Sequence, residues 1–134
     1  MAVKTNPIIL VIEDYSDTRK LMSSLLRAHG YKVIEASDGR EGLIQANRVT
    51  PDLILMDLAM PEMDGWETAR AIRTRCPDIN VILVTGYGTG TRPPAGEDGL
   101  VNGIIGKPFD FSQISQTITN VLANESMLEN AGAL

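Results

Sequence analysis

Acidic residues follow two apolar runs of the sequence. Glu13 and Asp14 come directly after Ile8–Ile12, and Asp57 comes directly after Leu53–Met56. Two unit charges about 4 Å apart repel by roughly 4 kcal/mol at an effective dielectric constant near 20, so three clustered carboxylates need a cation. Carboxylate oxygens suit Mg²⁺, which often binds phosphate oxygens as well. If the two runs are neighbouring strands, their ends form a candidate Mg²⁺ site.

A hydroxyl and an ammonium group follow two later apolar runs. Thr85 follows Val81–Val84, and Lys107 comes shortly after Ile104–Ile105. Together with Mg²⁺, these groups would surround an anion with several oxygens, such as a phosphoryl group attached to Asp57. An aspartate is ionised at neutral pH and can act as the nucleophile in phosphoryl transfer without a general base. The cation and Lys107 would offset the charge of the transferred group.

Each of these residues also has a structural explanation when it is considered alone. An acidic pair after a strand often starts a loop or caps a helix, and a β-branched residue such as Thr85 suits a strand end. Lys107 suits an exposed surface, and Asp64-Gly65 suits a turn. Acids, a hydroxyl and an ammonium group at four strand ends are better explained by a shared site.

These groups meet only if the elements that carry them are parallel strands. Five apolar runs alternate with segments of helical periodicity, and we expect strands at 8–12, 31–36, 53–57, 81–85 and 104–105. Strands separated by helices pair in parallel through right-handed crossovers, with helices on both faces of the sheet. Ligands then bind beyond the carboxyl ends of the strands. The sequence therefore predicts an α/β domain with its site at that edge.

Capping signals predict where the helices begin. Ser16 or Asp17 is expected to cap the first helix and Ser112 the last, Asp38 is expected to precede the second, and the third is expected from Trp66 onward. His29, the sole histidine, stands beside Gly30 at the end of the first helix, so we expect it to interact with the helix C-terminus rather than with a metal. The single cysteine, Cys76, excludes an internal disulfide and favours a reducing cytoplasm.

Two segments fit this alternation poorly. Residues 86–106 hold seven of the twelve glycines and the pair Pro93-Pro94, so we expect a short or distorted fourth helix there, or a mobile loop. Residues 124–134 have no strong pattern, which leaves a helix extension, a linker or a disordered tail open.

The bulk composition narrows the class of protein. The 134 residues suit one domain, and the formal net charge of −5 argues against direct binding to nucleic acid, because no basic surplus is present to neutralise phosphates. The early apolar run at 8–12 is too short for a membrane span or a signal peptide. We therefore expect a cytoplasmic protein without a membrane partner.

Four fragments, in this order, resemble the receiver domain of two-component response regulators: ILVIEDYSDTRK, PDLILMDLAMPEMDGWE, VILVTGYG and IIGKPF. The intervals also agree with that family, at 85 − 57 = 28 positions from Asp57 to Thr85 and 107 − 85 = 22 from Thr85 to Lys107. The resemblance implies a flavodoxin-like, doubly wound, five-stranded parallel sheet with strand order 2-1-3-4-5. It places a receiver domain at 7–123, after a leader at 1–6 and before a tail or linker at 124–134.

The resemblance also implies a set of metal ligands and a phosphoacceptor. Asp57 would accept a phosphoryl group from a sensor histidine kinase or a histidine phosphotransfer protein. Glu13, Asp14 and Asp57 would bind Mg²⁺ together with the backbone carbonyl of Ala59. The domain would then be a phosphorylation-dependent switch and not a dedicated enzyme, although it would catalyse its own phosphoryl transfer and dephosphorylation.

The same resemblance assigns roles to residues beyond the metal site. Thr85 would be the switch hydroxyl that moves onto the phosphoryl oxygens, and Lys107 would pair with those oxygens. Pro108 would follow a cis peptide bond, and Gly86 would leave room for the incoming group. The resulting change of surface would be read by an unknown downstream protein or by a missing output domain.

The sequence departs from the family pattern at two places besides the glycine-rich segment. Ile104 stands where the family usually has an aromatic side chain that swings inward on activation, so coupling to Thr85 through an aromatic rotamer is in question. Tyr87 and Ala59 would flank the path of the water that attacks the acyl phosphate, where they would tune its lifetime, although Tyr87 also suits local packing in a loop.

Three other classes of protein fit these residues less well. A small Mg²⁺-dependent phosphohydrolase with an aspartyl-phosphate intermediate is the main alternative, but the haloacid dehalogenase type places a second aspartate where this chain has Ala59. A flavodoxin-like cofactor protein needs a phosphate-binding loop after the first strand, where this chain has Glu13 and Asp14. An interaction module that is never phosphorylated would not need the acidic set.

Overall fold

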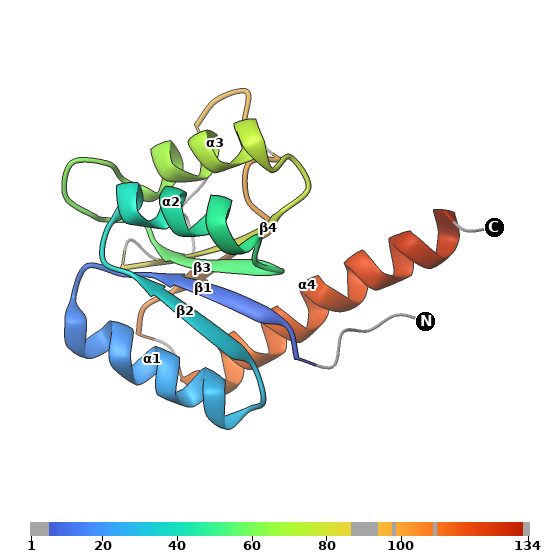
Figure 1. The fold of residues 1–134 in the computed structure, drawn as a ribbon, viewed down its shortest axis with the longest axis horizontal. Helices are drawn as coiled ribbons and strands as arrows, with labels where there is room; N and C mark the ends of the chain where they lie inside the picture. The colour runs from blue at the N-terminus through green and yellow to red at the C-terminus, as the bar shows by residue number, and fades with distance from the viewer. Residues whose placement is uncertain (1–5, 87–93, 98, 109, 133–134) are drawn as a thin grey trace.

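The computed structural model describes residues 6–86, 94–97, 99–108 and 110–132. Within these residues the chain forms five strands and four helices, drawn in Figure 1. In chain order they are β1 (Ile8–Ile12), α1 (Ser16–Ala28), β2 (Lys32–Ala36), α2 (Gly39–Val49), β3 (Leu53–Asp57), α3 (Gly65–Arg75), β4 (Asn80–Thr85), β5 (Gly103–Gly106) and α4 (Phe111–Gly132). All five expected strands are present.

The strands form one parallel sheet with the order β2-β1-β3-β4-β5. The strand order reverses between β1 and β3, where Ile9 pairs with Leu53 and Ile12 with Met56. The predicted α/β class, parallel pairing and strand order are confirmed. A parallel sheet of this kind opens a ligand site at the carboxyl ends of β1 and β3.

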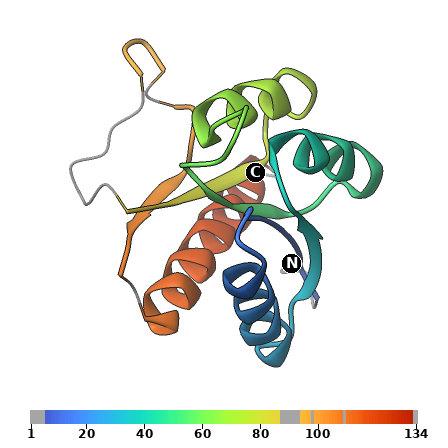
Figure 2. The same ribbon diagram turned by 90° about the vertical axis from the view of Figure 1, so that its left-hand side faces the viewer.

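Two helices cover each face of the sheet, as Figures 1 and 2 show. Leu10 and Ile12 of β1 lie in a core with apolar residues of α2 and α3. Ile9 and Val11 lie in the opposite core with residues of α1 and α4. Because both faces are covered, β3 and β4 are buried along their whole length, which explains their nearly continuous apolar sequences.

The helix starts agree with the predictions at α2 and differ at α1. Asp38 precedes α2 as predicted, and its side chain caps the helix by accepting a hydrogen bond from the Glu41 backbone N–H. The expectation that Ser16 or Asp17 caps α1 is wrong, because Ser16 is already helical and the N-cap residue is Tyr15, which makes no side-chain capping bond. At the other end of α1, the His29 Nδ1 atom lies 2.9 Å from the Leu25 carbonyl oxygen, in line with the predicted contact.

Two capping aspartates were not identified from the sequence. Asp64, interpreted as a turn residue, forms a capping box with Glu67 at the start of α3. The predicted cap of α4, Ser112, is wrong because Asp110 accepts the Gln113 backbone N–H and the Ser112 hydroxyl instead. In both cases an aspartate two positions earlier than expected accepts a backbone N–H of the first helical turn.

The described residues between β4 and β5, at 94–97 and 99–102, form turns and no helix, so the short or distorted fourth helix is not found among them; residues 87–93 of that segment lie outside the described residues. Two arginines of α3 hold this part. Arg70 makes a double hydrogen bond to the Glu97 carboxylate, and Arg73 donates to the Leu100 carbonyl and to the Asn102 side chain. Side chains of α3 therefore hold Glu97, Leu100 and Asn102, which lie outside regular helices and strands.

The last helix, α4, extends to Gly132, which settles one of the open alternatives for residues 124–134 in favour of a helix extension as far as that residue. In Figure 1 it packs below the sheet and then continues past it. Among the described residues, every helix is too short or too polar to cross a membrane.

Candidate functional site

Three carboxylates meet at the carboxyl ends of β1 and β3. The pairing of Ile12 with Met56 makes the next residues, Glu13 and Asp57, neighbours at the sheet edge. One carboxylate oxygen from each of Glu13, Asp14 and Asp57 lies within 4.8 Å of the others. Glu13 and Asp57 are 7% and 8% exposed, whereas Asp14 is exposed to solvent. The structure therefore brings together the three acids that the sequence predicted.

Lys107 supplies a positive charge at the same edge. Its Nζ atom lies 3.4 Å from Asp57 Oδ1 and 3.8 Å from Glu13 Oε1. The Lys107 backbone N–H donates to the Thr85 carbonyl at 2.7 Å, and the next peptide bond, to Pro108, is cis as expected. The ammonium group thus reaches the acids from the far side of β4.

The Glu13 side chain is held in a position that disfavours its charge. Burial raises the pKa of the Glu13 carboxyl to about 7, and the neighbouring carboxylates of Asp57 and Asp14 add to the rise. The backbone N–H of Tyr15, which donates to Glu13 Oε2 at 3.0 Å, and the ammonium group of Lys107 act in the opposite direction. A cation bound at this site would stabilise the ionised form.

The donor set fits Mg²⁺. Three carboxylates face a single ammonium group, so a negative charge remains, and hard carboxylate oxygens are the ligands that Mg²⁺ prefers. The exposed position of Asp14 leaves the cluster open to solvent, which suits an ion that keeps several of its waters. Ala59, whose carbonyl is the predicted fourth protein ligand, lies in the exposed loop that follows β3.

Gly65 allows the chain to pack closely against the backbone of Leu58 and Asp57. Its N–H donates to the Leu58 carbonyl at 2.8 Å. A Cβ atom at this position would lie 2.9 Å from Leu58 Cα and 3.0 Å from the Asp57 carbonyl oxygen. Real side chains do not approach backbone so closely, so the Asp57 loop and α3 pack together only with glycine here. The sequence Asp64-Gly65 predicted only a turn, and the close contact of Gly65 with Leu58 and Asp57 was not predicted.

Thr85 and Gly86 lie at the same edge, and Ile104 lies further back on β5. Thr85 is fully buried at the end of β4, opposite Gly106 of β5. Gly86 is exposed and has open space where a Cβ would point. Ile104 is half-buried and packs against the core that α2 and α3 share with the sheet. Tyr87, the predicted modulator of phosphoryl lifetime, lies outside the described residues.

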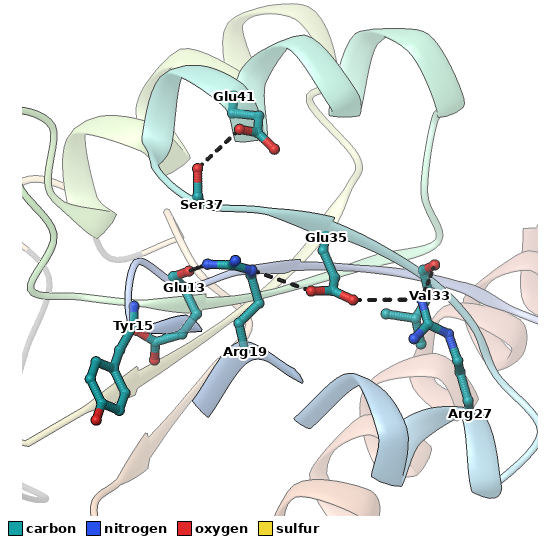
Figure 3. A network of polar contacts seen from close by, with 8 residues as sticks. All are labelled: Glu13, Tyr15, Arg19, Arg27, Val33, Glu35, Ser37 and Glu41. Carbon is teal, nitrogen blue, oxygen red and sulfur yellow. Dashed lines mark hydrogen bonds and ion pairs between the residues drawn. The ribbon is translucent and has the colours of Figure 1, made fainter. Parts of the chain in front are cut away.

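Arg19, which lies close to the acids, was not predicted from the sequence motifs. Arg19 of α1 donates from Nη1 to the Glu13 carbonyl at 2.9 Å and from Nε to Glu35 Oε1 of β2 at 3.2 Å. Figure 3 shows its guanidinium group between these two acceptors. The signal was present as the arginine of the fragment EDYSDTRK, six positions after Glu13.

Comparison with known proteins agrees with this geometry. Residues 9–119 match the family model of the response regulator receiver domain. The chain is 35% identical over 123 residues to the transcriptional regulatory protein ZraR of Klebsiella oxytoca, an alignment that covers 91% of this chain and 28% of that protein. The chain thus spans less than a third of the length of this relative.

Solved structures match over nearly their whole length. A response regulator receiver domain protein from Clostridium thermocellum superposes with a TM-score of 0.83 at 27% identity, covering 91% of this chain and 98% of that chain. The response regulator TrrA from Thermotoga maritima, solved in complex with Mg²⁺ and BeF, gives a TM-score of 0.76 at 27% identity and covers 85% and 97% of the two chains. Together with the family match, these similarities show that the chain belongs to the response regulator receiver domains.

Proposed function

We propose that this receiver domain is a phosphorylation-dependent switch in which Asp57 is the phosphoacceptor. The observation that carries the proposal is the convergence of Glu13, Asp14 and Asp57 with the ammonium group of Lys107 at one sheet edge. Asp57 is the acid of this set that both ends a buried strand and contacts Lys107. Its carboxylate is therefore held beside the positive charge that a transferred phosphoryl group needs.

The proposed step is a nucleophilic displacement at phosphorus. A carboxylate oxygen of Asp57 forms the new P–O bond while the P–N bond of a phosphohistidine breaks, and the electron pair of that bond stays on the imidazole nitrogen. Lys107 offsets charge on the transferred oxygens. When bound, Mg²⁺ would supply further positive charge to these oxygens. The phosphodonor is a sensor histidine kinase or a histidine phosphotransfer protein, as in other members of the family.

Glu13, Asp14 and Asp57 would hold Mg²⁺, with the Ala59 carbonyl as a further ligand. The negative balance of the cluster supports this assignment, as does the similarity to TrrA, whose structure contains Mg²⁺ and BeF. Thr85 would be the switch hydroxyl, because it ends the strand next to Asp57 and its carbonyl accepts the Lys107 N–H. A rearrangement at Thr85 would therefore be coupled to Lys107 through the backbone.

The proposed output is a change of binding surface and not turnover of a substrate. A separate downstream protein or another domain would recognise it, and the single cysteine of the chain fits a reducing cytoplasm as its compartment. The alternative phosphohydrolase function lacks support at Ala59, where the haloacid dehalogenase type would need a second acid.

The experiment that tests the proposal is incubation with acetyl phosphate and Mg²⁺, followed by intact mass measurement. We expect one added phosphoryl group, which is lost in Asp57→Asn and in the presence of EDTA. Asp52→Asn is the matched control, since Asp52 lies at the other end of β3 and binds the Ile8 backbone N–H. An adduct that persists in Asp57→Asn would contradict the assignment, and steady release of phosphate from a phosphomonoester would favour the hydrolase.

A further inference from the structure

Arg19 connects three elements around the acidic site. Its side chain projects from α1, is only 16% exposed, and donates to the Glu13 carbonyl after β1 and to the Glu35 carboxylate on β2. Figure 3 shows the guanidinium group pointing along the sheet toward the loop after β1. A cation this far removed from solvent needs paired acceptors, and these two supply them.

The backbone of Glu13 is held from both sides. Its N–H donates to the Ala36 carbonyl of β2 at 3.1 Å, and its carbonyl accepts from Arg19 at 2.9 Å. That carbonyl belongs to the peptide group that joins Glu13 to Asp14. Because a peptide group is planar, fixing its oxygen fixes the direction in which the chain leaves toward Asp14. The contact with Arg19 therefore constrains the placement of both acids.

The shape of the guanidinium group suits this task. Nη1 and Nε donate to two acceptors that belong to different elements, which a lysine ammonium cannot do from the same fixed plane. Glu35 in turn lies 3.7 Å from Arg27, one further contact along α1. The anchored carboxylate on β2 keeps Arg19 oriented toward Glu13.

We propose that Arg19 is a positioning residue for Mg²⁺ binding, acting by holding the Glu13–Asp14 peptide so that both carboxylates face Asp57. The inference rests on the proposed function of the site and adds to it a residue that contacts neither the metal nor the phosphoryl group. Removal of a partner that orients a metal ligand typically lowers metal affinity by about 10- to 100-fold.

The test is a calorimetric titration of the metal-free domain with Mg²⁺, in wild type and in Arg19→Gln. We expect about tenfold weaker binding in the variant. The rate of phosphorylation by acetyl phosphate should need about tenfold more Mg²⁺ for half-saturation, while its maximal value stays within about threefold of wild type. In the absence of metal, amide exchange of Tyr15, whose N–H donates to Glu13 Oε2, should be faster in the variant.

Arg27→Gln is the matched control. It removes a cation from the same helix and a contact with the same Glu35, together with a bond to the Val33 carbonyl, but it does not reach Glu13. Its Mg²⁺ affinity should stay within about twofold of wild type. The Mg²⁺ affinity of Arg19→Lys should lie between those of wild type and Arg19→Gln, because a single ammonium group replaces the Nε and Nη1 donors.

The outcomes separate the two proposals. Arg19 has no positioning role if Arg19→Gln binds Mg²⁺ as tightly as wild type, if Arg27→Gln weakens binding equally, or if only the maximal rate falls. Failure of the wild-type domain to bind Mg²⁺ or to accept a phosphoryl group would overturn the proposed function itself. If Arg19→Gln does not fold, Mg²⁺ binding is measured in Arg19→Lys and Glu35→Gln instead. Wild-type Mg²⁺ affinity in both variants would overturn the inference.

Discussion

The ammonium nitrogen of Lys107 lies 3.4 Å from Asp57 Oδ1, although the two residues end strands that are separated by β4. The same nitrogen is 3.8 Å from Glu13 Oε1, so Lys107 bridges acids from β1 and β3. Its backbone N–H is bound by the Thr85 carbonyl, which sets the distance across β4. This arrangement makes separate predictions for metal binding and for phosphoryl transfer.

Lys107→Gln should affect Mg²⁺ binding and phosphorylation differently. Removal of a positive charge from the acidic cluster should leave Mg²⁺ affinity unchanged or make it several-fold tighter, whereas phosphorylation by acetyl phosphate should slow by at least about tenfold because charge stabilisation is lost. Calorimetry and intact mass measure the two effects. Lys20→Gln, which removes an exposed lysine of α1, serves as the charge-matched control. Loss of Mg²⁺ binding in Lys107→Gln would contradict the prediction.

Gly65→Ala should destabilise the domain and impair phosphorylation together. The added Cβ would meet the backbone of Leu58 and Asp57 at about 3 Å, and overpacking of this kind costs about 1–3 kcal/mol of unfolding free energy. Urea denaturation measures the loss. Gly99→Ala, at a position with open space around the added Cβ, should change stability by less than about 0.5 kcal/mol. Equal effects of both substitutions would show that close packing at Gly65 is not the cause.

The raised pKa of Glu13 predicts a pH dependence with opposite signs for the metal-free and metal-bound domain. Its folded-state pKa of about 7 exceeds the ordinary value of 4.5, so the folded domain binds the extra proton between these values. This stabilising contribution is complete below pH 4.5 and is lost as the pH rises through 7. Between pH 5.5 and 8 the metal-free domain should therefore lose thermal stability.

Mg²⁺ should reverse that trend. In the proposed site Glu13 binds Mg²⁺ in its ionised form, so Mg²⁺ affinity should increase as the pH rises from 6 to 8, with release of a proton at the lower pH. Thermal unfolding with EDTA and with Mg²⁺ at several pH values measures both effects. Glu13→Gln should flatten both dependences, and an unaltered pH profile in that variant would assign the titration to another group.

Asp110→Ala should weaken α4 more than Ser112→Ala does. Asp110 accepts the Gln113 backbone N–H, and loss of such an N-cap costs about 1 kcal/mol. Ser112 donates its hydroxyl to Asp110 and leaves the helix N–H groups capped when it is removed, so its substitution should cost less than about 0.5 kcal/mol. Urea denaturation of the two variants provides the comparison, and a larger loss in Ser112→Ala would restore the original prediction.

The features predicted from the sequence are those with a strong local pattern. The alternation of five apolar runs with helical segments predicted a parallel sheet, and the acids that follow two of these runs predicted its ligand-binding edge and the convergence of the three carboxylates. Apolar runs of this kind specify strands directly, because β-branched and aliphatic residues buried on both faces have few alternatives.

The features that were missed depend on contacts between distant residues. Asp110 and Ser112 are both suitable N-cap residues and lie two positions apart. Which of them caps α4 depends on the backbone geometry before the helix, and the structure has Asp110 in that role. The close approach of Gly65 to Asp57 exists only after α3 packs on the sheet. Arg19 likewise meets Glu13 only because α1 returns alongside β1 and β2.

The division of the site among strands has a mechanical consequence. β1 and β3 supply the acids and the residue after β5 supplies Lys107, so anything bound between them ties these strands together across β4. Ligand binding to the folded state alone adds to stability in proportion to the logarithm of its concentration. Amide protection should therefore rise at this end of β1, β3, β4 and β5 when Mg²⁺ or a phosphoryl group is bound between them.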